Sequence, residues 1–166
     1  ASPFCTSPAV DLFLVGCDEQ RAFDALRAVH ETVLKNACCR VACVRSASAL
    51  TVSAGFPRRH AQVVLRLYAS PAAVLASFDV DACCFVYDGE RVLASARGLR
   101  ALIERTNRVD PARRSLTYES RLIKYALRGF SVFVPPRLYK PSAVDPRVYD
   151  LCLALREHHP RCLAAT

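Results

Sequence analysis

The chain has 166 residues, of which 52% are hydrophobic and 23% are charged. A chain of this length folds as one domain with a substantial core, and its hydrophobic share is too high for an intrinsically disordered segment. No apolar run approaches the roughly 20 residues that a membrane-spanning helix needs. The formal net charge of +8 favours polyanionic partners such as RNA, DNA or nucleotides. Alternatively, the excess of arginine reflects the codon usage of a GC-rich genome, because the arginines are spread along the whole chain and are not clustered.

Nine cysteines are present, and their spacing does not suit a disulfide framework. No pair has the C-x-x-C spacing of zinc and redox sites; Cys38-Cys39 and Cys83-Cys84 are directly adjacent instead. Several cysteines fall in or beside apolar runs, so we expect buried free thiols that behave as small hydrophobic side chains. They predict an intracellular, reducing compartment, either cytoplasmic or nuclear. A metal site assembled from cysteine and histidine across the fold is the alternative.

The first half of the chain alternates between strand-like and helix-like segments. Val10–Gly16 is a short apolar run typical of a buried strand, and Asp18 can N-cap the helix after it. That helix carries one apolar stripe, made of Phe23, Leu26, Val29, His30, Val33 and Leu34. The segments that favour strands are Arg40–Arg45, Ala49–Ala54 and Ala61–Tyr68. Pro71 then opens a short helix that ends near Ser77.

The second half begins with an alternating segment, Phe78–Tyr87, which predicts a strand. Asp88-Gly89 is a turn signal, and Arg91–Ala94 is the hairpin partner. The remaining expected elements are a basic amphipathic helix at Ala96–Arg105, a loop at 107–115, a helix at Thr117–Arg128, a strand at Ser131–Val134 and a last helix from Asp145. The last helix carries an apolar stripe of Val148, Leu151, Cys152 and Leu155. This order predicts a single α/β (α+β) domain, with a mixed β-sheet and helices packed on it.

Acidic residues occur on two of the expected strands. Asp11 lies near the start of the first strand, and the spacing of Asp79 and Asp81 by two puts both side chains on one face of a strand. A buried carboxylate is costly unless a cation or a metal compensates it. Aspartates on neighbouring strands are suited to Mg²⁺ with a nucleoside triphosphate. The alternative is that they lie at strand ends in solvent, or pair with an arginine such as Arg66.

Four segments resemble the nucleotidyltransferase (polymerase-β-like) superfamily, in a form found in large multidomain proteins. They are VDLFLVG from Val10, AQVVLRLYASP from Ala61, FDVDACCFVYDG from Phe78 and SRLIKYALRGF from Ser120. The resemblance covers about Val10 to Pro136. It implies residues 1–9 as a lead-in, 10–136 as the nucleotidyltransferase-like domain, and 137–166 as a C-terminal helical extension packed on it.

The resemblance also implies a set of metal ligands. In that superfamily a Gly-Ser turn precedes a strand with Asp-x-Asp, and a third acidic residue lies on a neighbouring strand; the three carboxylates hold two metal ions. Asp11 matches the second aspartate, and Asp79 or Asp81 matches the third carboxylate. Asp11 and Asp81 are therefore the expected metal ligands. The first aspartate falls on Ala9, and a Ser-Pro sequence replaces the Gly-Ser turn, which puts catalysis in doubt.

Basic residues form three candidate contacts with a polyanion. Arg58 and Arg59 lie in an expected turn, where a solvated turn is the alternative. Arg113 and Arg114 precede the expected helix at 117–128, and Arg121, Lys124 and Arg128 share one face of that helix. A solvated helix face is equally compatible with this spacing.

Two functions follow from these observations. The first is a catalytically degenerate nucleotidyltransferase-fold domain, a pseudoenzyme without a cofactor, that binds nucleic acid or protein within a larger protein or assembly. The second is an active transferase that uses Mg²⁺ to move a nucleotide from a nucleoside triphosphate to RNA, protein or a small molecule. No membrane association is expected in either case.

Overall fold

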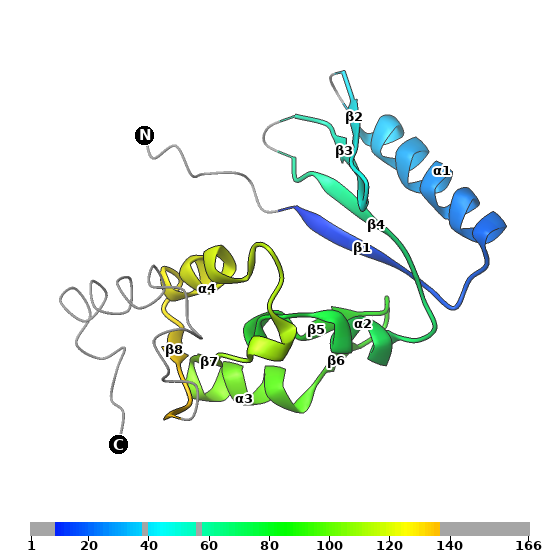
Figure 1. Cartoon of the computed structure of the whole chain (residues 1–166). Helices are drawn as coiled ribbons and strands as arrows, with labels where there is room; N and C mark the ends of the chain where they lie inside the picture. The colour runs from blue at the N-terminus through cyan, green and yellow to red at the C-terminus, as the bar shows by residue number, and fades with distance from the viewer. Residues whose placement is uncertain (1–8, 38–39, 56–57, 137–166) are drawn as a thin grey trace. The chain divides into compact units, whose positions relative to one another are not determined.

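The computed structural model describes residues 9–37, 40–55 and 58–136 (Figure 1). The chain divides into two compact units, residues 1–73 and 74–166, each of which is considered by itself. The described residues form a mixed α+β protein with a mixed four-stranded sheet and four α-helices. This confirms the predicted α+β class with a mixed sheet, whereas the nucleotidyltransferase-like fold stays a prediction. Most of the expected lead-in (1–9) and the expected C-terminal extension (137–166) lie outside the described residues.

The first unit is a four-stranded sheet with one long helix. Its elements are β1 (Val10–Val15), α1 (Glu19–Asn36), β2 (Ala42–Arg45), β3 (Ala49–Ser53) and β4 (Ala61–Tyr68). The strand order is β1-β4-β3-β2, in which β1 and β4 are parallel and the other neighbours are antiparallel. Helix α1 packs against β3 and β4, and Figure 1 shows it beside the sheet. The strands β1 and β2 are therefore the two edges of the sheet.

Local signals in the first unit act as the sequence predicts. The side chain of Asp18 accepts a hydrogen bond of 2.8 Å from the backbone N–H of Arg21, which caps α1. Gly16, between β1 and α1, has a φ of +63°, a conformation that glycine adopts at little cost. The expected apolar stripe of α1 is only partly covered, because Ala22 is buried while Phe23 and Leu34 are exposed.

The second unit is built from short elements. Helix α2 (Pro71–Ser77) leads into it, and a hairpin of β5 (Phe85–Tyr87) and β6 (Val92–Ala94) follows. Helix α3 (Ala96–Glu104) continues into β7 (Thr106–Arg108), which pairs in parallel with β8 (Ser131–Phe133) after helix α4 (Tyr118–Ala126). Two 3₁₀ turns complete it, η1 (Asp81–Cys83) and η2 (Pro111–Arg113).

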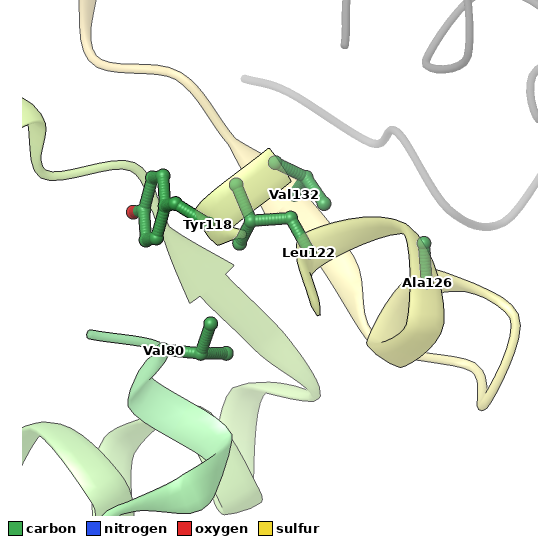
Figure 2. Packing of buried hydrophobic residues seen from close by; sticks show 5 residues of the cluster. All are labelled: Val80, Tyr118, Leu122, Ala126 and Val132. Carbon is green, nitrogen blue, oxygen red and sulfur yellow. The ribbon is translucent and has the colours of Figure 1, made fainter. Parts of the chain in front are cut away.

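A small hydrophobic core lies between these elements. Its buried members are Val80, Tyr118, Leu122, Ala126 and Val132. They come from the segment before η1, from α4 and from β8, as Figure 2 shows. Tyr118 is therefore a core residue, as the sequence suggests, and its hydroxyl accepts a hydrogen bond of 3.0 Å from the backbone N–H of Asp110.

Two sequence predictions in the second unit are wrong. The strand expected over Phe78–Tyr87 is confined to Phe85–Tyr87, because η1 turns the backbone at Asp81. The backbone N–H of Cys84 donates to the carbonyl of Asp81, a 3₁₀ contact that no strand can make. The loop expected over 107–115 contains the end of β7 and the η2 turn. The two aspartates therefore do not lie on a strand.

Candidate functional site

Asp81 is almost fully buried, and its carboxylate contacts several segments of the second unit. One carboxylate oxygen is 3.1 Å from Nη1 of Arg97, and the other is 3.0 Å from Nη2 of Arg100. The second oxygen also accepts a hydrogen bond of 3.2 Å from the backbone N–H of Arg108. Asp81 thus joins η1, α3 and β7 through one carboxylate.

Asp79 is also buried and makes a second, separate set of contacts. Oδ1 is 2.8 Å from Nη1 of Arg121 on α4 and accepts a hydrogen bond of 2.8 Å from the backbone N–H of Val80. Oδ2 accepts a hydrogen bond of 2.8 Å from the hydroxyl of Ser115. Every oxygen of the two buried carboxylates therefore has a donor from the protein itself. A buried carboxylate with such partners is compensated as an ion.

The arginine side of this network is only partly exposed. The side chain of Arg97 also donates to the backbone carbonyl oxygens of Leu75 and Phe78, so it ties α3 to α2 and to the residue after it. Arg121 donates from Nη2 to Sγ of Cys83 at 3.4 Å. Burial opposes the charge on Arg121, but Cys83 and Asp79 beside it leave its pKa raised.

Two donors in this region have no hydrogen-bond partner among the described residues. They are Nε of Arg100 and Nδ2 of Asn107, both buried. Asn107 is fully buried on β7, and its Oδ1 accepts a hydrogen bond of 2.8 Å from the backbone N–H of Ala82. The polar cluster around Asp81 is thus rich in donors, which suits carboxylates and does not supply ligands for a cation.

Burial also changes the acidity of two phenols and one thiol nearby. It raises the pKa of Tyr125 to about 12, with a further contribution from the hydrogen bond to Cys83. It raises the pKa of Tyr118 and of the Cys84 thiol as well. These groups therefore stay protonated at neutral pH.

The third candidate carboxylate, Asp11, has a different environment. It is exposed on the edge strand β1, opposite Gln62 of β4, and so it is not the buried strand carboxylate that the sequence predicts. Ala9, at the position of the missing aspartate, is also exposed. Asp11 belongs to the first unit whereas Asp79 and Asp81 belong to the second. A metal site shared by Asp11 and Asp81 therefore stays a prediction.

The candidate polyanion contacts fall into two groups. Arg113, Arg114 and Arg121 form ion pairs with Asp110, Glu119 and Asp79 respectively. Arg58, Arg59, Lys124 and Arg128 are exposed, and the guanidinium of Arg128 lies over the ring of Tyr125. On α4 the predicted basic face is thus divided, because Arg121 turns inward to Asp79. Arg66, proposed as a partner of the aspartates, instead lies over Tyr68.

The described cysteines and acidic residues show no assembled metal site. Cys17, Cys43, Cys83 and Cys84 are free thiols, of which Cys84 is buried and Cys43 is exposed. The expectation of burial is therefore wrong for Cys43. Within 9–37, 40–55 and 58–136, no three His, Cys, Asp or Glu side chains come together as metal ligands. In the same ranges, no helix is both long and apolar enough to cross a membrane.

Comparison with known proteins gives one informative relative. No family model matches the sequence, and no solved structure matches it. An uncharacterised protein of Acanthamoeba polyphaga mimivirus, R883, is 36% identical to this chain over 92 residues. The match covers 55% of this chain and 20% of the viral protein. The similar region is thus a limited part of a much longer polypeptide.

Sequence reasoning finds the two buried aspartates but not their partners. Arg97, Arg100 and Ser115 are 16 to 36 residues away along the chain. A usable signal is the spacing of Arg97 and Arg100 by three, which places both on one side of α3. Asn107 gives no signal, because a polar residue between two other polar residues is typical of a loop.

Proposed function

We propose that this chain is a nucleotidyltransferase-like domain that has lost nucleotide transfer and serves as a binding or scaffolding module within a larger protein. The alternative is an active, Mg²⁺-dependent transferase. The proposal rests on the order of the four resembling segments and on the state of the three candidate carboxylates. The greater length of the viral relative supports a role inside a multidomain protein.

The loss of catalysis is inferred from Asp81, because both of its carboxylate oxygens already bind donor groups of the protein. A catalytic metal needs carboxylate oxygens that face an open site, because Mg²⁺ holds substrate phosphates and water in its remaining positions. Both oxygens of Asp81 instead face Arg97, Arg100 and the backbone of Arg108. Binding a cation there requires breaking two ion pairs and leaving two guanidinium groups without their counter-ion, which is a steep cost in a buried site.

The other carboxylates support the same conclusion. Asp79 is engaged by Arg121 and Ser115, so it cannot replace Asp81 without a similar loss. Asp11 lacks the partner aspartate two residues before it, since that position is Ala9. A two-metal mechanism needs ligands that bridge ions about 3.5–4 Å apart, and one exposed carboxylate does not supply them.

The exposed positive charges of Lys124 and Arg128 favour a polyanion as the partner. Lys124 on α4 and Arg128 in the turn after it are both exposed and four residues apart, so both can contact successive phosphates of RNA or DNA. The flat face of Tyr125, already below the guanidinium of Arg128, lies between them in sequence. Protein partners in the same assembly are compatible with this function.

Nucleotide transfer provides the first test. Wild-type protein is incubated with labelled nucleoside triphosphates, Mg²⁺ or Mn²⁺, and RNA or protein acceptors. We expect no incorporation, and none for Ala9→Asp, because Asp79 and Asp81 remain paired with arginine. Incorporation by the wild type that is abolished by Asp11→Asn, but not by the exposed control Asp24→Asn, would establish the active enzyme instead.

Nucleic-acid binding provides the second test. In the double variant Lys124→Glu/Arg128→Glu, the salt dependence of RNA binding is expected to fall by about two units of slope, one for each lost phosphate contact. The matched control is Arg91→Glu/Arg108→Glu, which removes the same charge at surface ion pairs elsewhere in the unit. If both double variants bind equally, the α4 face is not the contact. If the wild type binds neither RNA nor DNA, the module acts on proteins alone.

A further inference from the structure

Helix α3 has its charged and apolar sides reversed relative to an ordinary surface helix. Its three large aliphatic side chains lie outward, with exposed fractions of 48% for Leu99, 50% for Leu102 and 81% for Ile103. Its inner side consists of the buried Gly98 and Ala101 flanked by two arginines. Spacings of three and four place the aliphatic residues in one stripe along the helix. We call these three residues the α3 stripe.

The orientation of α3 is fixed from the inside, so the stripe cannot simply rotate inward. Arg97 and Arg100 on the inner side pair with Asp81. Gly98 lies so close to η1 that a Cβ built on it would be 2.6 Å from the carbonyl oxygen of Cys84. Turning the helix to bury Leu99 and Ile103 would break both ion pairs and open this contact. A covering element therefore has to come to the stripe.

The size of the stripe indicates what kind of element can cover it. A stable interface between separate proteins uses about 20–30 residues on each side, and three side chains on a nine-residue helix are far fewer. A segment tethered to the same chain needs much less area, because the tether supplies a high effective concentration. The stripe thus favours an intramolecular partner over a second copy of the chain.

The C-terminal part of the sequence contains a matching segment. Residues 145–157 carry their own apolar stripe, Val148, Leu151, Cys152 and Leu155, with the spacings of three and four that pair two helices. The described chain ends after β8, whose Phe133 is paired with Arg108 at the far end of β7. Because β7 follows α3 directly and spans only about 10 Å, the stripe is within reach of the eight residues 137–144, which extend to about 26–29 Å.

We propose that the segment 145–157 docks as an amphipathic helix on the α3 stripe and covers Leu99, Leu102 and Ile103. The helix that the sequence predicts at the C-terminus then has a defined place on the second unit. The docked segment covers the α3 stripe, which faces outward because Arg97 and Arg100 lie on the inner side of the helix. This inference does not depend on whether the domain transfers nucleotides.

Hydrogen–deuterium exchange on the full chain tests this docking. In the wild type, backbone amides of 147–157 are expected to be protected. In Leu102→Glu/Ile103→Glu they should exchange about tenfold faster or more, because two buried carboxylates would oppose docking. The matched control is Leu116→Glu, at a fully exposed leucine outside the stripe, which should leave the protection unchanged. The reciprocal variant Leu151→Glu should deprotect the segment and speed exchange within α3.

Three results would overturn the proposal. The first is rapid exchange of 147–157 in the wild type. The second is protection that persists in both Leu102→Glu/Ile103→Glu and Leu151→Glu, since the segment would then be covered elsewhere. The third, from light scattering, is a wild-type dimer that Leu102→Glu/Ile103→Glu converts to a monomer, because a second copy would then occupy the stripe.

Discussion

In the first unit the candidate carboxylate Asp11 is exposed on an edge strand, whereas in the second unit Asp79 and Asp81 are buried among arginines. The first unit is held mainly by strand pairing and by apolar residues such as Val52 and Val63. The second unit has short strands and a small core, and its elements are joined through charged side chains. An exposed aspartate thus contributes little to holding the first unit together, whereas the buried aspartates join the elements of the second unit. The two units should respond very differently to substitution.

The largest effect is expected from removing the carboxylate at the centre of the second unit. Asp81→Ala leaves the partly exposed Arg97 and Arg100 without their counter-ion. Removing one partner of a fully buried ion pair costs about 3–5 kcal/mol, and partial solvation of these arginines places the loss toward the lower end of that range. That loss is a large part of the total stability of a small domain. Urea unfolding followed by circular dichroism measures it. The control Glu104→Gln removes an exposed ion pair with Arg108 and should cost less than about 1 kcal/mol. Equal effects of the two variants would show that the buried Asp81 contributes no more to the second unit than an exposed ion pair does.

A smaller effect on stability is expected at Gly98, where the direction of the change distinguishes an open helix from a tightly packed one. In an open helix, Gly→Ala stabilises by about 1 kcal/mol through helix propensity. Here the added methyl group would meet the backbone of Cys84, and such overpacking costs about 1–3 kcal/mol. Gly98→Ala should therefore lower the melting temperature. An increase would show that α3 does not lie tightly against η1.

Alkaline pH tests the half-buried phenol of Tyr125 in the second unit. The folded-state pKa of Tyr125 is about 12, above its ordinary value of 10, so the folded state retains a proton that the unfolded state loses. This contribution to stability is fully present below pH 10 and is lost as the pH rises toward 12. The pH dependence of unfolding between pH 10 and 12 should be shallower in Tyr125→Phe. Tyr87→Phe, at an exposed position on the hairpin, is the control and should follow the wild type.

The smallest effect is expected on the outer strand of the first unit. Val44 on β2 is 64% exposed, so Val44→Lys should change the free energy of unfolding by no more than about 0.5 kcal/mol. Val52→Ala, on the adjacent strand but fully buried, should cost about 1–3 kcal/mol. Thermal unfolding of both variants tests whether β2 is an exposed edge. A large loss in Val44→Lys would mean that another element covers it.

The parts of the fold that the sequence predicts well are those with local signals. The strand β4 and the helix α2 have the expected bounds, Ala61–Tyr68 and Pro71–Ser77, because Pro71 and the apolar run define them within a few residues. The turn at Asp88 is equally local: its carboxylate accepts hydrogen bonds from the backbone N–H groups of Arg91 and Glu90, which lower its pKa.

The candidate site could not be predicted in the same way. The alternation Phe-Asp-Val-Asp-Ala favours a strand, but burial of Asp79 and Asp81 is decided by cations on α3 and α4, far along the chain. Asp81 pairs with Arg97 and Arg100 on α3, Asp79 pairs with Arg121 on α4, and the backbone turns at η1 next to them. Strand β7 is missed for a related reason, since its three residues are polar and its pairing with β8 is also distant in sequence.

The engagement of Asp81 by three separate segments has a consequence for how its evolutionary history should be interpreted. Selection for folding alone would retain this aspartate, together with its two arginines, in a lineage that no longer needed it for any chemistry. Under the proposed function, an aspartate that related sequences retain at this position would then be a record of structural constraint. Activity would have to be judged from the positions that folding does not protect, of which the exposed Ala9, just before β1, and Asp11 on the edge strand are the clearest.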